Sequence, residues 1–201
     1  MLTTLRRQSA TGLRVLIVMT VLCGVAYPLA IWAVARVPGL SSSAEGSVVA
    51  GGAGSSLIGI DPVAADPDAD PYFHTRPSAS SHTALGPADT TTSGGSNDGG
   101  FSADLLAAVD QRRTLIAARE GVPPQAVPPD AVTASASGLD PDVSPAYAAL
   151  QVDRVARVTG LPVGRVRALV DGATSARILG FLGEPAVNVT ELNLAVRDAR
   201  G

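Results

Sequence analysis

The sequence contains no lysine, one cysteine and few aromatic residues. Aromatic side chains make up 3% of the 201 residues, so the core must be built from small aliphatic side chains, and we expect modest stability without a partner. Cys23 is the single cysteine, which excludes an intramolecular disulfide, and its position in an apolar run makes a thiolate nucleophile implausible. All 15 basic residues are Arg, which we attribute to a compositional bias of the whole sequence.

Charge is distributed unevenly along the chain. Among the first 36 residues the only charged side chains are Arg6, Arg7, Arg14 and Arg36, whereas all 18 acidic residues come later. From residue 37 onward, 11 Arg stand against 18 acids, a net charge of −7. An acidic domain of this kind disfavours nucleic acid as a partner.

Residues 15–35 carry no charged side chain, and at about 1.5 Å per residue a helix of this length spans a bilayer core. We therefore predict a transmembrane helix over 15–35. Gly24, Tyr27 and Pro28 lie near its middle, where Pro opens the backbone hydrogen-bond ladder and kinks the helix unless neighbours re-satisfy it. Trp32 suits an anchor at the membrane interface.

The Arg residues that flank this segment predict its orientation. Three precede it and one follows, so the positive-inside rule assigns residues 1–14 to the cytoplasm and residues 36–201 to the outside. A signal peptide cleaved after Ala33-Val34-Ala35 is the alternative, although the apolar run is longer than such peptides usually have.

Residues 38–100 are rich in Gly, Ser, Pro and Asp and predict little regular structure. We expect two short strands, Ser47–Ala50 and Ser55–Ile60, around a Gly51-Gly52 turn, and then an extended loop over Asp61–Pro71.

Asp66, Asp68 and Asp70 imitate the opening of an EF-hand calcium loop. Because Pro71 stands where that loop needs Gly, and Pro77 where it needs Glu, we prefer a solvated acidic loop.

The stretch Tyr72–Ala79 places aromatic residues, His74 and Arg76 beside a proline. Single His and Arg residues in such a run are usually structural and satisfy loop carbonyls. His82 lies eight residues from His74 without nearby cysteines, so a zinc site is unsupported and no metal site is predicted. Ser, His and Asp are present without nucleophile-elbow spacing, which leaves a membrane-anchored extracytoplasmic hydrolase or binding module as an alternative function.

Helical periodicity predicts a helix over Phe101–Glu120, stopped by Gly121, and a shorter one over Val163–Val170. A third is expected from residue 189, where Asn188 and Glu191 fit a capping box. The alternation of apolar and polar residues across Val187–Leu194 makes a strand the alternative prediction there. Asn188-Val189-Thr190 is also a glycosylation sequon.

Between these helices, the first half of Asp130–Arg157 is rich in turn-forming residues, and the second half contains no helix-breaking residue. We expect an ordered loop followed by a helix that starts at Ser144-Pro145 and ends at Gly160 before Pro162. The fold class predicted is thus a single N-terminal transmembrane helix followed by one α+β extracytoplasmic domain.

With these pieces in order, the chain resembles the KdpC family, the C subunit of the Kdp potassium-transporting ATPase, over nearly its full length. The segments that carry the resemblance are Gly24–Leu29, Tyr72–Ala79, Ser93–Asn97, Val132–Asp140, Gln151–Ala156 and Gly183–Leu194. Departures from the family pattern are Ile60, where Gln is usual, Asp98, where Leu is usual, and a shorter linker over Val48–Ala53.

The resemblance implies a non-catalytic, single-span subunit of an ATP-driven high-affinity potassium importer in the bacterial cell membrane. Its implied partners are the potassium-conducting and ATP-hydrolysing subunits, with ATP bound at the level of the complex. Two roles are implied: stabilising the complex at its outer face, and raising the ATP affinity of the ATPase subunit as a catalytic chaperone. Direct contact with ATP conflicts with the predicted topology, because a domain outside the membrane cannot reach cytoplasmic ATP.

The resemblance also suggests site residues. A Gly-containing run that only loosely resembles a phosphate loop supplies the candidates for nucleotide binding, namely Ser93, Gly94, Gly95 and Asn97. The candidates for contact with partner subunits are Gly24, Tyr27, Pro28, Thr133, Ser135, Ser137, Asp140, Gln151 and Arg154. No catalytic residue is predicted.

Overall fold

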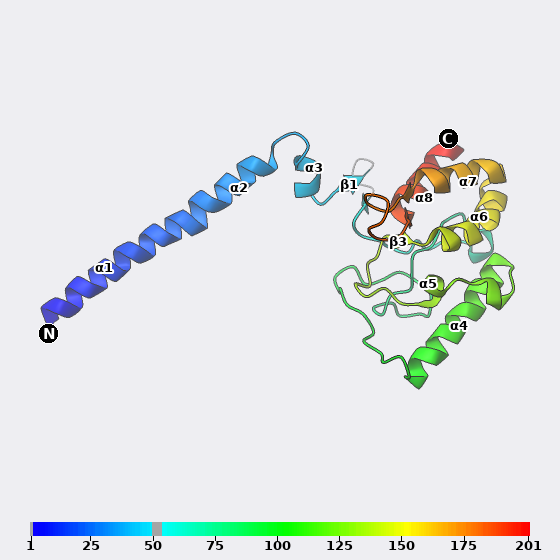
Figure 1. Cartoon of the computed structure of the whole chain (residues 1–201), viewed down its shortest axis with the longest axis horizontal. Helices are drawn as coiled ribbons and strands as arrows, with labels where there is room; N and C mark the ends of the chain where they lie inside the picture. Colours follow the sequence, from blue (N-terminus) through cyan, green and yellow to red (C-terminus); the bar gives the residue numbers. More distant parts are fainter. Residues whose placement is uncertain (1, 50–53) are drawn as a thin grey trace. The chain divides into compact units, whose positions relative to one another are not determined.

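The computed structural model describes residues 2–49 and 54–201, and the chain folds as two units, residues 1–47 and 48–201 (Figure 1). A long N-terminal apolar helix is followed by a mixed domain of helices and small sheets, which confirms the predicted fold class.

The first unit consists mainly of one helix that runs from Leu2 to Ala35 and is long and apolar enough to cross a membrane. It comprises α1 (Leu2–Val21), the π-helical turn η1 (Leu22–Ala26) and α2 (Tyr27–Ala35). The π turn ends two residues before Pro28, which has no N–H to continue the ladder, and the Tyr27 N–H bonds to the Leu22 carbonyl five residues back. The predicted disturbance of the helix thus takes the form of a π turn.

Where the bilayer begins and ends along this helix stays a prediction, residues 15–35. At its C-terminal end, the Arg36 guanidinium lies 5.2 Å from the centre of the Trp32 ring and 2.5 Å from the Glu45 carboxylate. The short helix α3 (Ser41–Ala44) follows.

The second unit opens with a two-stranded antiparallel sheet of β1 (Val48–Val49) and β2 (Gly54–Ser55). The predicted strand Ser55–Ile60 is wrong beyond Ser55, because the chain turns back there and Ser55 forms an isolated bridge with Ile58. The predicted Gly51-Gly52 turn lies outside the described residues.

A second antiparallel sheet has the strand order β3-β5-β4. Its strands are β3 (Asp142–Val143), β4 (Thr174–Ser175) and β5 (Ala186–Asn188). In the central strand, Val187 lies opposite Val143 on one side and Thr174 on the other.

Helices are the main regular elements of the second unit (Figure 1). They are α4 (Ala103–Glu120), α5 (Pro129–Val132), α6 (Pro145–Thr159), α7 (Val163–Gly172) and α8 (Val189–Arg200), with the short 3-10 turns η3 (Pro67–Ala69) and η4 (Pro124–Ala126).

The predicted helix caps are confirmed. The Ser144 hydroxyl accepts a hydrogen bond from the Tyr147 N–H, and the Asn188 side chain accepts one from the Glu191 N–H. Gly121 and Gly160 end their helices in the left-handed conformation.

Three predicted boundaries need correction. The helix α4 begins at Ala103 rather than Phe101, because the Ser102 hydroxyl caps it. The helix α7 continues to Gly172, and the loop expected between Asp130 and Ser144 contains the last turn of α5 and the strand β3.

The core of the second unit lies around α6, whose Tyr147, Val152 and Val155 are almost completely buried. Most other core residues are Val and Ala, as the small share of aromatic residues predicted, and Phe73, Ile116 and Leu192 are the larger exceptions.

Candidate functional site

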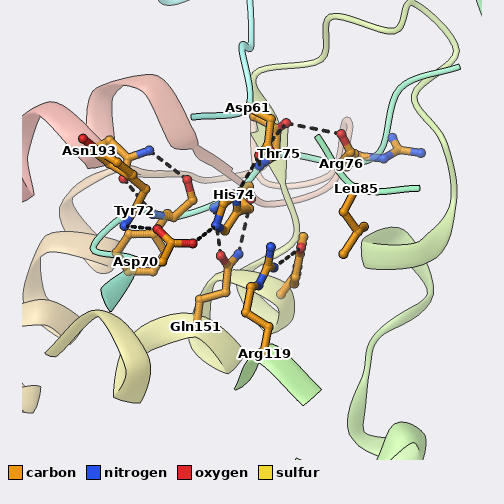
Figure 2. Close-up of polar contacts among 12 residues, drawn as sticks. Asp61, Asp70, Tyr72, His74, Thr75, Arg76, Leu85, Arg119, Gln151 and Asn193 are labelled. Atoms are coloured by element: carbon orange, nitrogen blue, oxygen red, sulfur yellow. Dashed lines mark hydrogen bonds and ion pairs between the residues drawn. The ribbon is translucent and has the colours of Figure 1, made fainter. Parts of the chain in front are cut away.

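The most concentrated polar site in the second unit surrounds His74, in the extended segment that crosses α6 and α8 (Figure 2). The His74 N–H donates to Gln151 Oε1 at 2.8 Å, and Gln151 Nε2 donates to the His74 carbonyl at 3.3 Å. Asn193 makes the same pair of bonds with the Phe73 backbone, each at 2.8 Å. Two carboxamides therefore satisfy buried backbone groups that would otherwise need a neighbouring strand.

The His74 imidazole lies between two carboxylates. Its Nδ1 is 3.0 Å from Asp61 Oδ1, and its Nε2 is 2.5 Å from Asp70 Oδ2. Burial opposes the charge on His74, but the hydrogen bonds to Asp61 and Asp70 outweigh it, so the pKa of His74 is raised. Burial likewise opposes the charge on Asp70, yet its bond to His74 lowers the pKa of Asp70 overall. The two carboxylates therefore favour the protonated imidazolium form of His74.

Behind Asp70, a second set of charges continues the site into the core. Arg154 donates to the Asp70 and Tyr72 carbonyls at 2.8 and 2.9 Å and pairs with Glu120 at 2.9 Å. The other oxygen of Glu120 accepts from Arg119 at 2.7 Å.

Arg119 also donates to the Tyr147 hydroxyl at 3.0 Å, and burial raises the pKa of Tyr147 to about 12. This phenol therefore stays neutral.

We call the set Asp61, Asp70, His74, Arg119, Glu120 and Arg154 the His74 cluster. With the imidazole protonated, three carboxylates balance three cations, which is the condition under which buried charges are tolerated. The two Asp lie on opposite ring nitrogens and cannot converge on one ion. Among residues 2–49 and 54–201, no three His, Cys, Asp or Glu side chains are placed to hold a metal.

A groove of about 520 Å³ lies between the segment 54–72 and α8, and no residue of the His74 cluster lines it. Its lining is largely apolar and includes Ile58, Ile60 and Leu194. Among the described residues that line it there is no Asp, Glu, His or Cys. The groove therefore lacks a general base that a hydrolase would need near neutral pH.

The predicted nucleotide-binding run packs against the loop after α5. The Gly94 N–H and the Ser93 hydroxyl both donate to the Ser137 carbonyl, at 2.8 and 3.1 Å. A Cβ on Gly95 would come within 3.2 Å of the Ala136 carbonyl oxygen, and Asn97 folds back to donate to the Gly95 carbonyl at 3.1 Å. The Gly94 N–H, which a phosphate cradle would use, is thus already bonded.

The residues predicted to contact partners differ in accessibility. In the first unit Gly24, Tyr27 and Pro28 are exposed. In the second unit, Thr133 and Ser137 are exposed, and Asp140 is half-buried and pairs with Arg76 at 3.1 Å.

Ser135, Gln151 and Arg154 are buried instead. The Ser135 N–H donates to the Pro77 carbonyl at 2.8 Å, while Gln151 and Arg154 belong to the polar network around His74. These three side chains have internal roles, so they form no part of an accessible contact surface.

Sequence reasoning missed most of the His74 cluster. His74 was expected to satisfy loop carbonyls, whereas its ring bonds to carboxylates. The one sequence feature that could have indicated the cluster is the acid-rich run Asp61–Pro71, which comes just before His74. Nothing local pointed to Glu120 or Asn193.

Comparison with known proteins identifies the chain's relatives. The family model described as KdpC, K+-transporting ATPase, c chain, matches residues 9–198. This chain belongs to the KdpC family. The potassium-transporting ATPase KdpC subunit of Kineococcus radiotolerans is 50% identical to it over 201 residues, which cover 98% of this chain and 97% of the relative. The KdpC subunit of Streptomyces coelicolor is 41% identical, with 97% and 94% covered.

Family membership confirms the resemblance drawn from the motifs. KdpC chains are non-catalytic subunits of the Kdp potassium-transporting ATPase, and membership implies other Kdp subunits as partners. The long apolar helix is consistent with a single-pass anchor. The hydrolase alternative has no support from the groove or from the relatives.

Proposed function

We propose that this KdpC-family chain is the accessory subunit of an ATP-driven, high-affinity potassium importer, with residues 1–14 in the cytoplasm and the α+β domain outside. The observation that carries the proposal is the family match over residues 9–198 of a chain with one membrane-length helix. Its partners are the potassium-conducting and ATP-hydrolysing subunits.

The role proposed for the outer domain is to stabilise the complex at the outer face of the potassium-conducting subunit. A balanced, buried charge cluster ties the long irregular segment to α4 and α6, which favours a rigid domain over a catalytic one. Its acidic character would also raise the local cation concentration modestly, although salt screens this effect.

Co-purification tests the subunit role directly. Expressed with the other Kdp subunits and extracted in mild detergent, the full chain should elute with both of them at constant ratio. Elution as a lone monomer, with the other subunits assembled without it, would refute the proposal.

Cysteine labelling tests the orientation. In a Cys23→Ser background, Ser96→Cys lies in an exposed loop of the domain and Ser9→Cys is exposed near the N-terminus. An impermeant thiol reagent should label the first in intact cells and the second only after lysis. The reverse pattern would overturn the proposed topology.

Direct contact with ATP through Ser93–Asn97 is the second role that the family suggests. The proposed topology and the occupied Gly94 N–H both argue against it. A Cβ on Gly94 meets no atom within 4 Å, so Gly94→Ala should assemble normally and leave the apparent ATP affinity of the complex unchanged. Weakened ATP affinity with intact assembly would favour direct contact.

A further inference from the structure

A tight hairpin joins β4 to β5 along the chain and is drawn as an orange loop beside α8 (Figure 1). We call residues 177–184 the apical hairpin. Ile178 and Leu182 exchange backbone hydrogen bonds at 2.9 and 3.0 Å, and the Gly180 N–H donates to the Arg177 carbonyl at 3.1 Å. The Arg177 and Glu184 side chains pair at 2.5 Å across its base. The hairpin thus satisfies much of its own backbone and neutralises its own charges.

Its apolar side chains face solvent. The exposed fractions are 70% for Ile178, 81% for Leu179, 67% for Phe181 and 50% for Leu182. Single exposed apolar residues are ordinary on protein surfaces, but four large ones within five positions form a contiguous patch, which usually marks an interaction site.

The backbone at the apex is also unfavourable for the residue it carries. Leu179 and Gly180, in the three-residue loop between Ile178 and Leu182, have φ values of 55° and 81°, the left-handed region that favours Gly and Asn. Leu is disfavoured there because its Cβ crowds the backbone, and it is exposed as well. Neither its conformation nor its burial in this chain accounts for a Leu at this position, which points to a role for its side chain in a contact outside the domain.

The binding partner of the hairpin must be complementary to a rigid, uncharged tip. A bilayer surface is a poor match, because surface-binding segments rely on Lys and Arg, whereas Arg177 is paired and the chain from residue 37 onward has a net charge of −7. A pre-formed tip instead suits a shaped apolar pocket, since little conformational freedom is lost on binding. Membership in the KdpC family provides protein partners in the same membrane.

We propose that the apical hairpin inserts Ile178, Leu179 and Phe181 into an apolar pocket on the outer face of the potassium-conducting subunit. This inference rests on the proposed subunit role and names the surface that performs it.

The test measures the affinity of the full chain, in detergent, for a Kdp complex purified without this subunit. Leu179→Asn places a residue that the left-handed turn favours, so the fold should be kept or stabilised while an anchor is lost. Phe181→Ser removes the aromatic side chain. Each should weaken binding at least about tenfold, as expected for anchor residues of an interface.

Phe101→Ser is the matched control, because Phe101 is likewise an exposed Phe but lies outside the hairpin, before α4. It should bind as the wild type does. Hairpin variants that bind within about twofold of the wild type would overturn the inference and leave the subunit role intact, whereas a wild-type chain that does not bind would overturn both.

A fluorescent probe separates a protein pocket from lipid. Leu179→Cys, in a Cys23→Ser background, would carry an environment-sensitive dye in nanodiscs of phosphatidylethanolamine and phosphatidylglycerol. A blue shift that appears only when the other Kdp subunits are present supports the inference. A blue shift in nanodiscs that hold this chain alone would assign the hairpin to the bilayer and overturn it.

Discussion

Replacing His74 with Gln should destabilise the second unit, residues 48–201, and remove much of the pH dependence of its stability. The substitution leaves the buried Asp70 carboxylate with the Tyr72 N–H at 3.0 Å and Arg154 at 3.6 Å, and deprives Asp61 of its cationic partner. Removing one member of a buried ion pair typically costs about 3–5 kcal/mol. For a domain of about 150 residues, this corresponds to a melting temperature lower by roughly 6–20 °C.

The pH dependence follows from the direction of the pKa shift. Because the pKa of His74 is raised on folding, its contribution to stability is complete below the unfolded value of about 6.5 and is lost as the pH rises through the higher folded pKa. The pKa of Asp70 is lowered on folding, so its contribution is lost only as the pH falls below about 4. The wild-type domain should therefore lose stability from near neutral to alkaline pH.

Thermal unfolding of the full chain in detergent, followed by far-UV circular dichroism at pH 6 and pH 9, measures both effects. We expect the wild-type melting temperature to fall between these pH values and that of His74→Gln to change little. His82→Gln is the control, because His82 is exposed, and it should keep the wild-type behaviour. If His74→Gln retained the wild-type pH slope, the imidazolium would not be the group responsible and the reasoning would fail.

Two further predictions concern packing and capping, and both are measured as melting temperatures of the full chain. A Cβ on Gly59 would overlap the Asp140 carbonyl oxygen, so Gly59→Ala should cost about 1–3 kcal/mol, whereas Gly164→Ala, where a Cβ meets nothing within 4 Å, should be neutral or stabilising by up to ~1 kcal/mol; equal effects would contradict the close packing at Gly59. Ser144→Ala removes the cap of α6 and a hydrogen bond to Asp130 at 2.9 Å, and should cost about 1–2 kcal/mol. Ser144→Asp can still cap α6, but its negative charge faces Asp130. This variant should retain part of the lost stability only if capping contributes more than the bond to Asp130.

Local chemistry made several elements predictable. Ser144 caps α6 and Asn188 caps α8 because a side-chain oxygen can reach an N–H three residues on, which needs no distant partner. Gly121 and Gly160 stop their helices because only a residue without a Cβ adopts the left-handed conformation easily. The short strands were harder, because pairing of two or three residues depends on what lies beside them.

The His74 cluster depended on contacts that no local pattern encodes. His74 bonds to Gln151, 77 residues later, and Phe73 bonds to Asn193, 120 residues later. These pairings exist because the extended segment lies across both α6 and α8, and this arrangement is a property of the folded domain.

The sequence by itself determined the apolar helix, the main helices with their caps, and the family, because hydropathy, capping and ordered motifs are read along the chain. Only the tertiary structure decided which polar residues are accessible. Gln151 and Arg154 were predicted to contact partners, yet packing buries both beneath the 70–76 segment, while the apical hairpin remains exposed. Burial results from segments far apart in sequence coming together, which is why it could not be predicted from the residues alone.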